Sequence, residues 1–67
     1  MTQVISDVDS YITANSGDSG RDVYDGVSPP HKRHQVKHAI NILLENGDIA
    51  ETPAGNGRWY DNTYAPV

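Results

Sequence analysis

Apolar residues recur at helical spacing near the start of the chain. Between Gln3 and Ala14 they stand three and four positions apart, which predicts a helix whose buried face carries Val4, Ile5, Val8, Tyr11 and Ile12. Thr2 is placed to cap this helix. Residues 15–20 are small or polar, a composition typical of a loop.

A shorter apolar pattern follows that loop. Val23 and Val27 stand four positions apart, which predicts a short helix over residues 21–27. Ser19 is placed as its N-cap and Gly26 as its C-terminal stop. A helix of this length is unstable alone, so we expect it to depend on packing.

The strongest helical pattern lies in the middle of the chain. Ser28 and the two prolines after it suit a helix start, and we expect the helix to run to Asn46, with Gly47 as its C-cap. With about 100° between residues, one side of this helix collects Val36, Ala39, Ile40, Leu43 and Leu44. The opposite side collects His34, Gln35, His38 and Asn41, with Lys37 at its flank.

Two extended segments end the sequence. Residues 48–52 and 58–64 are expected to pair as antiparallel strands around a turn at residues 53–57, which is rich in Gly and Asn. Alternation along the second strand would place Trp59 on the opposite face from Tyr60 and Tyr64. The order of elements predicts one α+β domain over residues 1–67, with three helices followed by a two-stranded antiparallel hairpin.

Length and composition narrow the function classes. The chain has 67 residues and no cysteine, so a small core has to stabilise it without disulfides. No apolar run approaches the roughly 18 residues needed to span a bilayer, and no signal-peptide pattern follows Met1. We therefore expect a cytoplasmic protein without a membrane partner.

The charge is unevenly distributed. The net charge is −4, yet Lys32, Arg33 and Lys37 lie in or beside the third predicted helix, together with all three histidines, and Arg58 lies at the hairpin turn. A polyanion responds to such a local concentration of charge rather than to the net charge. The fifth cation, Arg21, is expected to be a surface residue or a partner of Asp18 or Asp22.

Three stretches of this sequence resemble a known protein family. Residues 21–28 (RDVYDGVS), residues 36–51 (VKHAINILLENGDIAE) and the glycine-rich stretch Gly55-Asn56-Gly57-Arg58 are similar to winged helix-turn-helix DNA-binding domains. Two features depart from that family: the stretch 28–33 between helices is longer, and no clear short strand separates the first two helices. The resemblance implies that the third helix contacts bases and that the wing contacts flanking DNA.

The side chains of the third helix fit this division of contacts. Polar side chains can hydrogen-bond to base edges in the major groove, and cationic ones can contact phosphates. The resulting candidate DNA-binding residues are Lys32, Arg33, His34, Gln35, Lys37, His38, Asn41, Asn56 and Arg58. Imidazoles gain protons as the pH falls through about 6.5, so DNA affinity is expected to rise between about pH 7.5 and 6.

Other chemistries find less support in the sequence. His31, His34 and His38 have a spacing that zinc sites use, but three imidazoles along two turns rarely converge on one ion, so we expect no metal and no cofactor. The four aspartates 7, 9, 22 and 25 lie on solvated faces without a paired nucleophile, so we expect no enzyme activity. Trp59, Tyr60 and Tyr64 are expected to pack in the core or on the sheet, with a partner surface as the alternative.

The sequence thus predicts a small, sequence-reading DNA-binding protein that acts as a transcriptional or recombination accessory factor. Its expected partner is double-stranded DNA, with a homodimer or a partner protein on the DNA raising the affinity, and with no small-molecule ligand evident. Its size is typical of phage and mobile-element proteins. The alternative is a winged-helix module or inhibitor that binds a protein; the net charge favours this alternative, and the placement of the charges opposes it.

Overall fold

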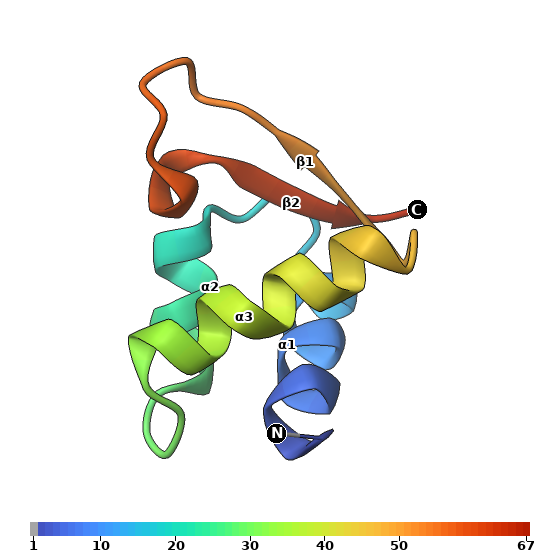
Figure 1. The fold of residues 1–67 in the computed structure, drawn as a ribbon, viewed down its shortest axis with the longest axis vertical. Helices are drawn as coiled ribbons and strands as arrows, with labels where there is room; N and C mark the ends of the chain where they lie inside the picture. Colours follow the sequence, from blue (N-terminus) through green and yellow to red (C-terminus); the bar gives the residue numbers. More distant parts are fainter. Residues whose placement is uncertain (1) are drawn as a thin grey trace.

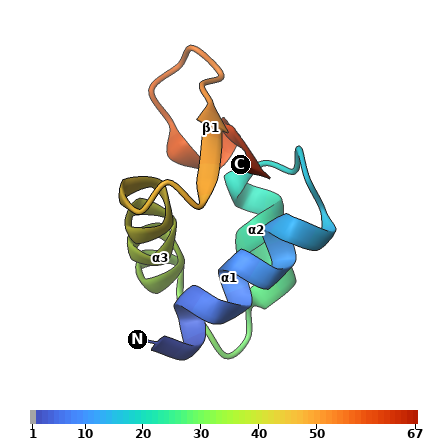
Figure 2. The ribbon, with the colours of Figure 1, turned by 90° about the vertical axis from the view of Figure 1, so that its right-hand side faces the viewer.

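The computed structural model describes residues 2–67 as three helices followed by a two-stranded antiparallel hairpin (Figure 1). In chain order the elements are α1 (Thr2–Ala14), α2 (Gly20–Val27), α3 (Arg33–Glu45), β1 (Ile49–Thr52), the 3-10 turn η1 (Trp59–Asp61) and β2 (Thr63–Pro66). The predicted α+β class and order of elements are confirmed. The helices pack together, and the hairpin closes one end of the helical group (Figure 2).

Most of the core comes from the apolar helix faces that the periodicity predicts, although Ile5, Tyr11 and Leu44 are only partly buried and pack against it. α1 contributes Val4, Val8 and Ile12, and α2 contributes Val23 and Val27. The remaining buried apolar residues come from α3 and the hairpin: Val36, Ala39, Ile40, Leu43, Ile49 and Tyr64. Burying these side chains removes apolar surface from water, the main favourable contribution to the stability of so small a domain.

The first two helices begin close to the predicted positions. α1 starts at Thr2, and the predicted capping role of the Thr2 side chain lies outside the side chains that the structure describes. Ser19 caps α2, as predicted, because its Oγ accepts a hydrogen bond from the N–H of Asp22 at 3.3 Å. The predicted stop at Gly26 is wrong: α2 continues to Val27, and Ser28 caps its C-terminus by donating its N–H to Tyr24 O at 2.9 Å.

α3 begins four residues later than predicted, because its N-cap is Lys32 and not Ser28. Lys32 is its N-cap, and the side-chain Oε1 of Gln35 accepts the backbone N–H of Lys32 at 2.8 Å. This bond satisfies an N–H at the helix start, whereas Ser28 is already used to end α2. The helix ends at Glu45, one residue before the predicted end, and Gly47 adopts a left-handed φ of 76° there.

The second half of the hairpin differs from the prediction. β1 and β2 pair in the register Ile49–Pro66 to Thr52–Thr63, but residues 59–61 form η1, so the predicted strand 58–64 is wrong at its start. The predicted alternation of Trp59 against Tyr60 therefore does not apply. Side chains hold the intervening loop in this shape: Asn62 Oδ1 accepts the N–H of Ala54 at 2.8 Å.

The segment between α1 and α2 lies along the other edge of β2. Ser19 and Thr63 form an isolated antiparallel bridge, and hydrogen bonds of 2.8–3.0 Å link Gly17 and Asp18 to Tyr64. The N–H of Gly20 also donates to Asn62 O at 2.9 Å. This pairing lies between the first two helices, where the sequence shows no clear strand. It also fixes the start of α2 next to η1. Within residues 2–67, no helix is long and apolar enough to cross a membrane.

Candidate nucleic-acid interface

Cationic side chains from two helices converge on the aromatic residues of η1. The Cζ atom of Arg33, in the first turn of α3, lies 4.6 Å from the centre of the Tyr60 ring and 6.0 Å from that of Trp59. Lys37 Nζ lies 5.8 Å from the centre of the Trp59 ring, and Arg21 Cζ of α2 lies 5.0 Å from that of Tyr60. These are cation–π distances, which orient the cations on the rings. We call Arg21, Arg33, Lys37, Trp59 and Tyr60 the cation–aromatic cluster.

Close contacts fix the position of Trp59. Gly20 opens α2 directly against Trp59, and a Cβ atom at Gly20 would lie 2.7 Å from both Cε3 and the carbonyl oxygen of Trp59. The hydroxyl of the buried Tyr64 lies 3.1 Å from the same carbonyl oxygen. The turn that carries the cluster is thus attached to α2 on one side and to β2 on the other.

Arg21 has a different partner from the one predicted. Arg21 is exposed, as expected of a surface residue, and its Nη2 lies 3.2 Å from Asp61 Oδ1 instead of pairing with Asp18 or Asp22. Hydrogen bonds from Asn56 and then from Arg21 lower the pKa of Asp61 below its ordinary value. The pair joins residues 40 positions apart, so no local sequence signal could have identified it.

The charges of Arg33 and Lys37 are not neutralised within the described chain. Neither forms an ion pair with a carboxylate among residues 2–67. Lys37 Nζ instead donates to Asn41 Oδ1 at 3.0 Å, one helical turn further along α3. Two adjacent positive groups on one helix face therefore remain available to an external anion.

The other predicted site residues fall into two groups. The side chains of Lys32, His34, His38, Asn41 and Arg58 are exposed. Gln35 is half-buried and uses Oε1 to cap α3, while its amide NH2 is not occupied by that bond. Asn56 braces the loop, since its Nδ2 donates to Asp61 Oδ2 at 2.8 Å and its Oδ1 accepts the N–H of Arg58 at 3.0 Å.

The three histidines do not act as a group. His31 lies in the connection before α3, its side chain only 11% exposed, and its Nε2 is 2.6 Å from Asp7 Oδ2 of α1. His34 and His38 remain on the exposed face of α3. In the part of the chain that the structure describes, no three His, Asp or Glu side chains are placed to hold a metal ion.

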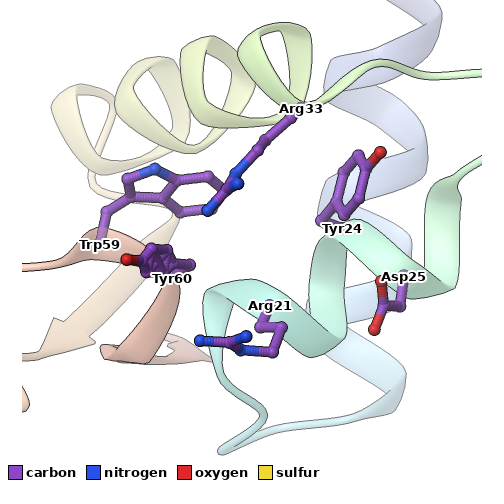
Figure 3. Close-up of a pocket in the computed structure, with 6 residues that line it drawn as sticks. All are labelled: Arg21, Tyr24, Asp25, Arg33, Trp59 and Tyr60. Carbon is purple, nitrogen blue, oxygen red and sulfur yellow. The ribbon is translucent and has the colours of Figure 1, made fainter.

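A hollow of about 250 Å³ opens beside the cluster, between α2 and η1 (Figure 3). Arg33 reaches into it from α3, Trp59 and Tyr60 lie on one side, and Tyr24 lies opposite them. Arg21 and Asp25 of α2 complete the lining. The predicted DNA contacts include none of these aromatic residues: Trp59 and Tyr60 were expected on a strand over residues 58–64, and Tyr24 on a short helix.

A second hollow, of about 420 Å³, lies on the exposed side of α3. Arg33, His34, Lys37 and Trp59 line it, so it shares Arg33 and Trp59 with the first. Its lining contains two cations and a histidine but no carboxylate. An anion on this side of Trp59 would therefore meet positive charge without a neighbouring negative one.

Comparison with known proteins yields no relative from which to transfer a function. No protein-family model matches the chain, and neither curated proteins nor solved structures gave a significant match. The arrangement of three helices and a hairpin is consistent with a winged-helix topology.

Proposed function

We propose that this domain is a winged-helix protein that binds double-stranded DNA, with α3 in the major groove and the loop between β1 and β2 acting as the wing on flanking DNA. The observation that carries the proposal is the convergence of Arg21, Arg33 and Lys37 on the turn that follows Arg58. Three of the five Lys and Arg residues of an acidic chain thereby meet at one turn beside α3. Such a local positive potential attracts the phosphate backbone.

The exposed residues of α3 supply the chemistry that base contacts need. His34, His38 and Asn41 are exposed on the helix and can donate or accept hydrogen bonds at base edges. Lys32, Arg33 and Lys37 lie close to them in sequence and are suited to phosphate contacts, which set the register of a helix on DNA. A role as a transcriptional or recombination accessory factor fits a domain of this size, acting by occupancy or by recruitment of a partner.

Salt-dependent binding to duplex DNA tests the proposal. Binding at low salt should weaken with a slope of log K against log salt of about −3 to −4 if four cations meet phosphates. Lys37→Gln should reduce the size of that slope by about one. Ser6→Glu is the matched control, because each substitution takes the net charge from −4 to −5, but Ser6 lies on α1, which contributes nothing to the cluster.

Two results would reject the proposal. One is the absence of duplex binding at low salt; the other is an equal loss for Lys37→Gln and Ser6→Glu, which would mean that only net charge matters. In the first case the acidic surface would favour the alternative, a winged-helix module that binds a protein.

A further inference from the structure

The hollow beside the cluster has the dimensions and lining of a site for one flat ring system. Its volume of about 250 Å³ is below the roughly 300–1,000 Å³ typical of small-molecule sites. Its walls offer the ring of Tyr24 and the guanidinium plane of Arg33, both of which stack on planar groups, and the Tyr60 ring, whose centre lies 4.6 Å from Arg33 Cζ, orients that guanidinium. A nucleobase is such a group, and base stacking on aromatic residues tolerates any sequence.

The charges around the hollow favour a position outside it for the phosphate of a bound nucleotide. Asp25 lies in the lining together with Arg21 and Arg33, so a phosphate inside the hollow would meet a carboxylate as well as the two cations. The carboxylate can accept hydrogen bonds from the amino group of a base instead. The second hollow shares Arg33 and Trp59 with the first and adds Lys37 without any carboxylate, which suits the sugar–phosphate chain attached to that base.

A base can enter this site only if its faces are not already stacked in a duplex. We therefore propose that the hollow between α2 and η1 binds one unpaired nucleotide of a DNA strand, and that the domain favours a duplex with a single-stranded overhang over a blunt duplex. The inference rests on the proposed DNA binding. It adds a structural preference that the contacts of α3 with duplex DNA would not produce.

Trp59 is the only tryptophan of the chain and lines both hollows, so its fluorescence reports directly on the site. The full chain is titrated with a short DNA hairpin that ends bluntly and with the same hairpin carrying a short overhang, at one salt concentration. The overhang should bind about tenfold more tightly and should quench Trp59 fluorescence. The blunt hairpin should change this fluorescence much less.

Tyr60→Leu tests the contribution of the ring that orients the Arg33 guanidinium in the hollow. Tyr60 lies outside the hydrophobic core, and leucine keeps an apolar side chain at the position while removing the ring. The ratio of overhang to blunt affinity should fall to about one. Tyr11→Leu is the control, since Tyr11 lies on α1, away from both hollows, and should retain the ratio. Thermal unfolding verifies that each variant is folded.

The outcomes separate this inference from the proposed function. Equal affinities for both hairpins with unchanged Trp59 fluorescence would overturn the inference while duplex binding stands. Failure of both hairpins to bind at low salt would overturn the inference and the proposed function. Equally tight binding of a free nucleoside monophosphate would also overturn it, because the site would then recognise a small molecule rather than a DNA end.

Discussion

The ring of Tyr11 on α1 occupies the space into which a Cβ atom of Gly26 on α2 would project. Gly26 lies inside the helix, one residue before its end, and therefore serves close contact between helices rather than termination. The hydroxyl of Tyr11 donates to Asp18 Oδ2 at 2.8 Å, which restrains the ring. The contact explains a glycine in a helix that would otherwise be more stable with alanine.

Gly26→Ala should lower the free energy of unfolding by about 1–3 kcal/mol, because the ring has to move. In a Tyr11→Ala background the same substitution should become favourable by about 1 kcal/mol, the difference in helix propensity between alanine and glycine. Urea denaturation of the four proteins in the cycle measures both values. An equal effect in the two backgrounds would show that the ring is not the cause.

The Asp7–His31 pair should make stability depend on acid pH. A hydrogen bond with His31, followed by one from Gln3, lowers the pKa of Asp7 below 3.8. The stabilisation is then complete above the unfolded-state pKa and is lost as the pH falls through the lower folded-state pKa. Asp7→Asn should be less stable than the parent at pH 6, and this difference should shrink below about pH 3.8. Asp9→Asn, with the same charge change, should not reproduce that pH dependence.

Tyr64 should contribute to stability through its hydroxyl. This side chain is 1% exposed, and its hydroxyl lies 2.7 Å from Glu51 Oε2 and 3.1 Å from Trp59 O. Tyr64→Phe should lower the free energy of unfolding by about 0.5–1.5 kcal/mol at neutral pH. Chemical denaturation followed by circular dichroism measures the loss, and Trp59 fluorescence reports whether η1 shifts.

The same residue should limit stability at alkaline pH. Burial, and then the hydrogen bond to Glu51, raises the pKa of Tyr64 well above its ordinary value of 10.0. A raised folded-state pKa stabilises the fold below the unfolded-state pKa, and this stabilisation is lost as the pH rises towards the folded-state pKa. The advantage of the parent over Tyr64→Phe should therefore decrease above about pH 10. A constant difference from pH 8 to 11 would contradict this assignment.

Gln35 should contribute to the stability of the folded domain in the absence of DNA. Gln35→Ala removes the acceptor for the Lys32 N–H and should cost about 0.5–1.5 kcal/mol of unfolding free energy. Gln35→Glu keeps an acceptor and adds negative charge near the helix N-terminus, so it should retain stability. His34→Ala is the control, because it also introduces alanine, with its higher helix propensity, at an exposed neighbouring position. If Gln35→Ala and His34→Ala unfold at the same urea concentration, the cap contributes nothing.

DNA affinity should rise severalfold as the pH falls from about 7.5 to 6, since protonated imidazoles on α3 attract phosphate. We expect His34 and His38 to carry this effect, because both are exposed on α3, whereas His31 lies against Asp7. Replacing both exposed histidines with glutamine should flatten the profile, measured by fluorescence anisotropy on duplex DNA. His31→Gln should leave the slope intact, and a flat profile in the parent would exclude the histidines from the interface.

The sequence by itself determined the order of the elements and most of the buried residues. The buried residues Val8, Ile12, Ile40 and Leu43 follow helical spacing, so they lie on the apolar faces of their helices. An amphipathic helix in a small domain packs this face against the core. Ser19 was also predictable as a cap, because its bond to Asp22 spans only three residues. These features depend on side chains a few positions apart along the chain.

Only the tertiary structure decided where α3 begins, that residues 59–61 form a turn, and that Arg21 joins Arg33 and Lys37 around Trp59 and Tyr60. The turn and the cluster depend on pairing between distant segments, such as Arg21 with Asp61 and Gly20 with Trp59, while the start of α3 depends on Ser28 being used to end α2. Local periodicity carries no information about such pairs, because their free energy arises only after the core has brought the segments together. The candidate site was thus visible in the sequence as a charged helix face, while its aromatic half appeared only with the fold.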